Sequence, residues 1–101
     1  MLVFFSDRYL KPGSWEQFRR AWQPEDADLP EGAIAIYHAR SVKDENEVIS
    51  FGIFEGSKED INKIRGGGSE EAELKRQDEM APFVKNVQAE GIYEVIEELR
   101  P

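Results

Sequence analysis

The side chains most often used for metal binding and nucleophilic catalysis are scarce in this chain. It contains one histidine, His38, and no cysteine, which excludes thiolate metal sites, thiol catalysis and disulfides. None of its serines has the spacing of a nucleophile elbow: Ser6, Ser14, Ser41, Ser50, Ser57 and Ser69. We therefore expect no bound metal ion and no cofactor.

Two other patterns resemble ligand sites but have a simpler structural explanation. The run Gly66-Gly67-Gly68 is not followed by Lys and Ser or Thr, and Glu70 and Glu71 would repel a phosphate. A flexible joint between two helices explains these glycines better. Glu71 and Lys75 form an i, i+4 pair, which is typical of a solvated helix face rather than a metal site.

A stripe of aromatic residues is the strongest indication of a binding site. Trp15, Phe18 and Trp22 recur at i, i+3 and i+7, which places them on one face of a helix. Against a sheet of small residues, these rings either fill the space or wall a pocket for a hydrophobic small molecule. The remaining candidate substrate-binding residues are two aromatic walls and three polar contacts: Tyr37, Phe54, Ser6, Arg8 and Ser50. Arg8 is the cation expected to favour an anionic ligand, and Tyr37 is a possible hydrogen-bond donor.

The elements that position these residues follow from turn, cap and periodicity signals. We expect one domain over residues 1–101, in the order β-α-β-β-α-β. The first half is predicted to hold a strand Leu2–Tyr9, a helix after the cap Ser14, and strands Ala33–Arg40 and Glu47–Phe54. A short helix with Ile61 and Ile64 should follow the cap Ser57, and a longer helix should follow Ser69. Beyond Pro82 we expect a last helical piece with Phe83, Val84 and Val87 that ends at Gly91, and then a strand Ile92–Leu99. This order predicts an α+β, ferredoxin-like fold with a four-stranded antiparallel sheet and helices on one face.

The two central strands predict which side of the sheet meets a partner. A symmetric turn at Asp44-Glu45 pairs Arg40 with Ile49 and Ile36 with Ile53. One face then carries Ile34, Ile36, His38, Ile49, Phe51 and Ile53; the other carries Ala33, Ala35, Tyr37, Ala39, Val48, Ser50, Gly52 and Phe54. Neither face is polar, as a solvated face would be. We expect the face of small residues under the helices and the Ile/Phe face, His38 included, against a second copy of the chain in a homodimer.

Charge and hydropathy exclude several other classes of partner. The net charge is −8, the wrong sign for a nucleic acid or an anionic membrane. RNA-recognition motifs share the predicted topology, and Phe51-Gly52-Ile53 faintly resembles their third strand. However, Ile49 stands where a basic residue is expected. The early apolar run Leu2–Phe5 is too short for a signal peptide or a membrane span, so the expected location is cytoplasmic.

Three segments resemble the dimeric α+β barrel superfamily, and within it the antibiotic-biosynthesis-monooxygenase-like proteins. The first is Tyr9-Leu10-Lys11-Pro12-Gly13 with Trp15 and Phe18 after it, similar to the family's strand and Lys-Pro-Gly turn. The second is Ser50–Glu59, similar to a third strand running through an aromatic residue towards Ser and the next helix. The third is Ile92–Ile96, similar to the last strand. Together they extend over nearly the whole chain.

The resemblance implies a dimer whose two sheets form a barrel, with a pocket between sheet and helices in each subunit. Some members oxidise aromatic polyketides without a metal or organic cofactor, and others bind and degrade haem. Active members often carry Trp where this chain has Phe54 and Asn near the position of Ser6, while residues 57–90 lack the histidine of the haem-degrading relatives. The expected function is oxidation or binding of a hydrophobic aromatic small molecule. The alternative is a non-enzymatic ligand-binding or interaction module with no catalytic pocket.

Overall fold

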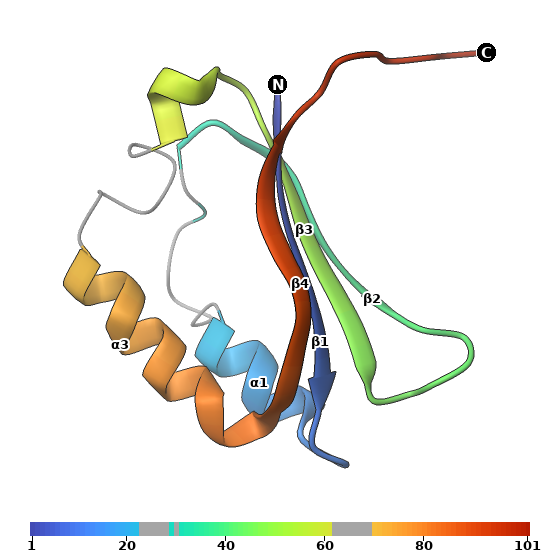
Figure 1. Ribbon diagram of the computed structural model, residues 1–101, viewed down its shortest axis with the longest axis vertical. Coiled ribbons are helices and arrows are strands. Elements are labelled where there is room, and N and C mark those ends of the chain that lie inside the picture. Colours follow the sequence, from blue (N-terminus) through green and yellow to red (C-terminus); the bar gives the residue numbers. More distant parts are fainter. Residues whose placement is uncertain (23–28, 30, 62–69) are drawn as a thin grey trace.

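The computed structural model describes residues 1–22, 29, 31–61 and 70–101, and its elements follow the predicted β-α-β-β-α-β order (Figure 1). The strands are β1 (Leu2–Leu10), β2 (Ala33–Arg40), β3 (Glu47–Phe54) and β4 (Val84–Glu94). The helices are α1 (Trp15–Trp22) and α3 (Glu70–Met80), with 3-10 turns η1 (Lys58–Asp60) and η2 (Ala81–Phe83). All strand pairs are antiparallel, in the order β2-β3-β1-β4. The ferredoxin-like α+β fold is therefore confirmed.

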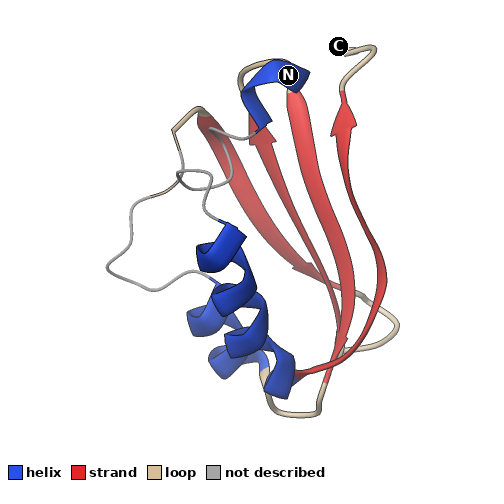
Figure 2. Ribbon diagram, turned by 60° about the vertical axis from the view of Figure 1, so that its left-hand side comes forward, coloured by secondary structure: helices blue, strands red, loops and turns tan. Residues whose placement is uncertain are grey.

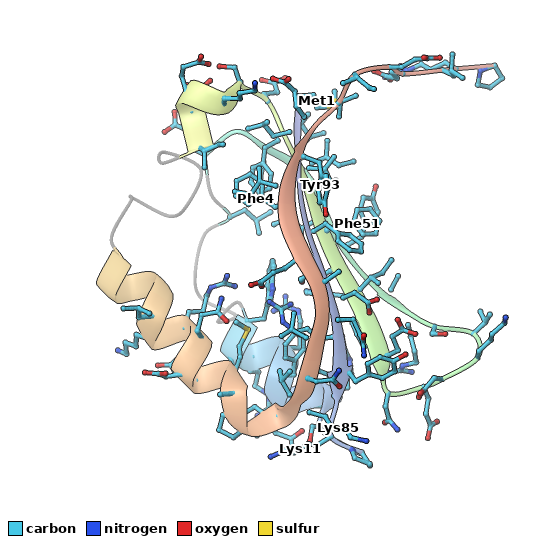
Figure 3. All side chains as sticks on the ribbon, viewed as in Figure 1. Met1, Phe4, Lys11, Phe51, Lys85 and Tyr93 are labelled. Carbon is cyan, nitrogen blue, oxygen red and sulfur yellow. The ribbon has the colours of Figure 1, made fainter. Side chains whose placement is uncertain are left out.

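Both long helices cover the same side of the sheet (Figure 2). We call this side the helix face. The opposite side, which no described helix covers, is the open face. Because side chains alternate along a strand, even-numbered β1 residues such as Phe4 lie on the helix face. Phe51 and Tyr93 point to the open face (Figure 3).

Helix α1 begins where the sequence predicts. Gly13 adopts a φ of +73°, which closes the turn after β1, and the Ser14 N–H donates to the Lys11 carbonyl at 3.1 Å. The Phe18 N–H then donates to the Ser14 carbonyl at 2.9 Å, which makes the first turn of the helix. The tight turn holds α1 close to the end of β1, so its aromatic stripe faces the sheet.

The hairpin between β2 and β3 corrects the predicted faces of β2. Arg40 pairs with Val48 and Ile36 with Gly52, one residue away from the predicted register. The loop between these strands is centred on Asp44 and is held by two hydrogen bonds. The Asp44 N–H donates to the Ser41 Oγ at 3.3 Å, and the Ser41 N–H donates to the Glu47 carbonyl at 3.0 Å. From Ala35 to Arg40, this shift of one residue moves each β2 side chain to the other face. A register irregularity between Ala33 and Ala35 leaves Ala33 on the helix face, where it packs against the cluster of Leu2 and Phe54. His38 therefore lies on the helix face rather than in the expected subunit contact, and Tyr37 lies on the open face.

The C-terminal third of the chain also differs from the expectation. Helix α3 ends at Met80, shortly before Pro82. This break is expected, because proline has no backbone N–H to continue the hydrogen bonds of the helix. The segment that follows is a strand, because Val84 and Val87 pair with Leu10 and Arg8 of β1. Gly91 lies inside this strand, and residues 95–101 are not part of the sheet. The predicted glycine joint at 66–68 and Ile64 lie outside the described residues.

Two hydrophobic clusters occupy the helix face, one towards each end of the sheet. The first cluster joins β1, β3, α1 and α3: Leu10, Phe18, Val48 and Met80, with Trp15, Ala21, Trp22, Phe83 and Val84 packed against them. The second lies towards η1: Leu2 and Phe54, with Phe4, Ala33, Ile36 and Ile61. Gly52 makes room for the Phe54 ring, since a Cβ at Gly52 would lie 2.6 Å from that ring.

The open face is apolar and carries two aromatic pairs. Tyr37 stacks on Phe51 with 5.1 Å between ring centroids, and Phe5 meets Tyr93 edge-on at 6.4 Å. Asp7 and Glu47 lie on the same face, towards the β2–β3 loop.

In the part of the chain that the structure describes, no helix is long and apolar enough to cross a membrane.

Candidate functional site

A row of polar side chains crosses the helix face between the two hydrophobic clusters. Ser6 of β1 and Ser50 of β3 are opposite each other, and His38 of β2 is opposite Ser50. The His38 Nδ1 and the Ser50 Oγ are hydrogen-bonded at 2.7 Å, with the donor set by the imidazole tautomer. The Arg8 guanidinium donates to the Ser6 Oγ. We call His38, Ser50, Ser6 and Arg8 the polar row.

The rings of α1 form an aromatic wall around His38. The His38 ring lies 5.4 Å from Trp15, 6.4 Å from Phe18 and 4.6 Å from Trp22, edge-on in each case. The Arg8 guanidinium lies over the Phe18 ring, 5.5 Å from its centroid. Phe18 therefore contacts both the cation of β1 and the imidazole of β2.

Burial differs along the polar row, and its most exposed member is His38, at the β2 end. Ser6, Arg8 and Ser50 are 7%, 5% and 3% exposed, whereas His38 is half-buried. Trp15 and Trp22 are also partly exposed. A molecule approaching from solvent therefore meets His38 and the two indoles before it meets the buried guanidinium.

The surroundings of His38 keep its imidazole neutral near pH 7. Burial, together with the positive charges of Arg19 and Arg8, lowers the pKa of His38 to about 4. A neutral imidazole has one N–H and one free lone pair. Among the described residues, Ser50 is the one hydrogen-bond partner of His38, through Nδ1, which leaves Nε2 available to a ligand.

Helix α3 supports the outer wall of the site. The Arg76 guanidinium lies over the Trp22 ring, 5.4 Å from its centroid, and donates to the Trp22 carbonyl at 3.2 Å. The contact holds the C-terminal end of α1, and with it Trp22, against α3. It also brings a second arginine to the aromatic wall, after Arg8 over Phe18.

The structure brings most of the predicted site residues together on the helix face. Ser6, Arg8 and Ser50 belong to the polar row, and Trp15, Phe18 and Trp22 form the wall around His38. Phe54 is also on this face, but it packs in the second cluster against Phe4, with 4.9 Å between ring centroids. Tyr37 is the exception, because the hairpin register places it on the open face.

His38 takes the place of Tyr37 among the residues that meet on the helix face, whereas the symmetric hairpin turn predicted it on the opposite face. A hairpin loop centred on Asp44, rather than between Asp44 and Glu45, predicts His38 on the helix face. The sequence signal for that loop is the pair Ser41 and Asp44, whose side chains accept hydrogen bonds from backbone N–H groups within it. Among the described residues, no group of three or more His, Asp or Glu side chains could hold a metal ion. The chemistry that the polar row offers is hydrogen bonding, positive charge and one proton acceptor.

Comparison with solved structures places this architecture among known folds. A Deinococcus radiodurans protein provisionally named an antibiotic biosynthesis monooxygenase aligns with a TM-score of 0.68 and 8% identity, over 100% of this chain and 98% of that chain. The chain shares the fold of this protein. A Nitrosomonas europaea protein with the same provisional name aligns with a TM-score of 0.66 and 16% identity, over 96% of this chain and 100% of that one.

A Mycobacterium tuberculosis protein shares this fold as well, with a TM-score of 0.68 and 15% identity over 98% of both chains. The predicted resemblance is thus confirmed at the level of the fold. No family model matches the sequence, and no curated protein does. At these identities the comparisons establish the fold alone, so a function has to be argued from the polar row and its aromatic wall.

Proposed function

We propose that the chain binds a hydrophobic aromatic small molecule on the helix face and oxidises it with O₂, without a metal ion or an organic cofactor. The convergence of the polar row with three α1 rings on His38 is the observation that carries this proposal. Aromatic rings provide stacking surface for an aromatic ligand, and a few buried polar groups beside them can orient it. The names of the solved relatives favour an oxygenase. We also propose a cytoplasmic location, which the absence of cysteine supports.

The proposed reaction needs a ligand that can itself supply electrons. A ring CH₂ group made acidic by its neighbours would become a carbonyl: O₂ gives one oxygen atom to carbon, and the other leaves as water with the two hydrogens. All four electrons come from the ligand. The protein would orient the ligand, exclude water and favour its anion. Arg8 is the buried cation of the polar row suited to that last task.

The second candidate is a non-enzymatic binding or interaction module. The edge-on contacts of Trp15, Phe18 and Trp22 with His38 favour it, since these rings already pack against one another and the imidazole. In this case the aromatic wall is core, and the rings would have to move apart to admit a ligand. Such packing is typical of a layer whose function is stability.

Tryptophan fluorescence and oxygen consumption separate these candidates. Polycyclic aromatic compounds should quench Trp15 or Trp22 at micromolar concentration, and an oxidisable one should give an oxygen-dependent product. Arg8→Ala should lower the turnover, whereas Val42→Ala, at a fully exposed residue of the β2–β3 loop, should not. Quenching without product supports the binding module. Silence across the panel, or unchanged affinity and turnover in Arg8→Ala, would count against the assigned site.

We also propose that two copies associate through the open face. The support is its apolar surface, with the aromatic pairs of Tyr37 with Phe51 and Phe5 with Tyr93 and the aliphatic Val3, Ile49 and Ile53. Covering such a face would bury about 800 Å² per subunit, an ordinary size for a stable interface. Light scattering should report a mass near twice 11.6 kDa. Phe51→Glu should lower it, and Val42→Glu, which adds the same charge off the face, should not; a monomeric wild type would refute the dimer.

A further inference from the structure

A short segment beyond β4 leaves the sheet on the side of the open face. The Val95 N–H donates to the Met1 carbonyl at 3.0 Å, which holds the end of β4 against the start of β1. The residues that follow lie outside the sheet and extend away from both long helices (Figure 1). We call residues 96–100 the arm.

The apolar side chains of the arm are in water when the chain is alone. Ile96 is 94% exposed and Leu99 is 84% exposed. Glu98 and Arg100 form an ion pair with each other inside the arm. An extended segment with two large aliphatic side chains in water is stabilised when another surface covers them. The exposed fractions show that its own subunit does not provide that cover.

The arm is long enough to reach a second copy placed on the open face. Two sheets packed face to face lie about 10 Å apart, and five extended residues span about 16 Å. Because the arm leaves its own sheet on the side where the second copy would lie, its tip would reach the level of the partner's sheet.

The two ends of the sheet differ in charge, and this difference selects the direction of packing. Acidic side chains predominate at the end that carries the arm: Glu55, Glu59, Asp60, Glu94, Glu97 and Glu98. The other end carries the exposed Lys11 and Lys85, beside the mixed charges of the β2–β3 loop (Figure 3). If the same ends met in a two-fold dimer, carboxylates would face carboxylates; opposite ends bring each arm to two lysines.

We propose that two copies pack open face to open face with their strands in opposite directions, so that the arm of each copy crosses to the other and buries Ile96 and Leu99 near its Lys11 and Lys85. The inference rests on the association of two copies proposed above and adds its direction and the segment that fastens it. Strand β4 is an edge of the sheet, and a two-fold axis across the strands places β4 of one copy over β4 of the other. The arm therefore meets the partner at the beginning of β4 and not at the β2–β3 loop.

Removing the apolar side chains of the arm tests whether it fastens the dimer. Ile96→Ser with Leu99→Ser should raise the dimer dissociation constant about a hundredfold or more, since four aliphatic side chains per dimer lose their cover. The matched control, Val42→Ser with Leu74→Ser, removes two exposed aliphatic side chains elsewhere and should leave the constant unchanged. Sedimentation equilibrium over a dilution series measures both constants, and circular dichroism establishes that each variant is folded.

Cross-linking tests where the arm lies, because the chain has no cysteine of its own. A short bis-maleimide should join Leu99→Cys to Asn86→Cys when the two single variants are mixed and allowed to exchange subunits. Neither variant alone should give a covalent dimer, since the two copies of each position would lie at opposite ends of the barrel. Positions 86 and 94 of one strand are about 26 Å apart, so a cross-link in the mixture joins two chains.

The possible failures are distinguishable. A double serine variant that dimerises as tightly as wild type would overturn the role of the arm and leave the open-face dimer of the proposed function intact. A covalent dimer of Leu99→Cys alone, or no cross-link in the mixture, would overturn the opposite direction of the strands. A monomeric wild type would overturn this inference together with the proposed dimer.

Discussion

The depressed pKa of His38 makes the stability of the fold depend on pH in a defined window. The unfolded chain binds a proton at His38 below about pH 6.5, and the folded chain does so below about pH 4. Between these values the unfolded state holds more protons. The contribution of the neutral imidazole is therefore fully present above pH 6.5 and is lost as the pH falls towards 4.

The magnitude follows from the same two values. For a single site, lowering the pH from 7 to 5 would cost about 2 kcal/mol of unfolding free energy. Because His38 is half-buried, solvent screening reduces this, and we expect about 1 kcal/mol. Carboxyl groups also titrate near pH 4, so the effect of His38 has to be isolated as a difference between wild type and His38→Asn.

Urea unfolding of both proteins at pH 7 and pH 5 measures that difference. Wild type should lose about 1 kcal/mol more than His38→Asn over this interval. An NMR titration of the folded wild-type protein checks the cause directly, because the chain has a single histidine. A folded-state midpoint near 6.5, or equal losses of stability in the two proteins, would refute the reasoning from burial and from Arg19 and Arg8.

The remaining predictions concern Gly52, Glu47 and Ser50. Gly52→Ala should destabilise the fold by about 1–3 kcal/mol in thermal unfolding, because its Cβ would lie 2.6 Å from the Phe54 ring; an unchanged melting temperature would contradict that contact. The hydrogen bond that protonated Glu47 donates to the Asp7 carboxylate, burial and the Asp7 charge all raise the pKa of Glu47. The Glu47 carboxylate therefore opposes folding once the pH exceeds the ordinary pKa of a glutamate. Glu47→Gln should therefore be more stable than wild type at pH 7 but not at pH 3.5, and the raised pKa of Tyr9, caused mainly by Glu47, should return towards 10 in an absorbance titration. Ser50→Ala should cost about 1 kcal/mol in urea unfolding through the lost His38 hydrogen bond, and no loss would indicate that the bond is not formed in solution.

Local signals in the sequence were sufficient to predict the order of the elements and most of the residues that meet on the helix face. The Lys11-Pro12-Gly13 turn and Ser14 place the start of α1, and the two central strands occupy the predicted residues 33–40 and 47–54. The spacing of Trp15, Phe18 and Trp22 correctly predicts that these rings share one face of α1 and point towards the sheet. These features depend on neighbours within a few residues of each other, which is the distance over which turns, caps and periodicity act.

Tertiary structure decided what depends on pairing between distant segments. Residues from Val84 onwards form a strand because β1 offers them a hydrogen-bonding partner, a contact that bridges more than 70 positions of the chain. The side of the sheet on which His38 lies depends on a hairpin register that differs by one residue from the symmetric choice. Because side chains alternate with a period of two, that one residue decides whether the imidazole lies on the open face or beside the rings of α1.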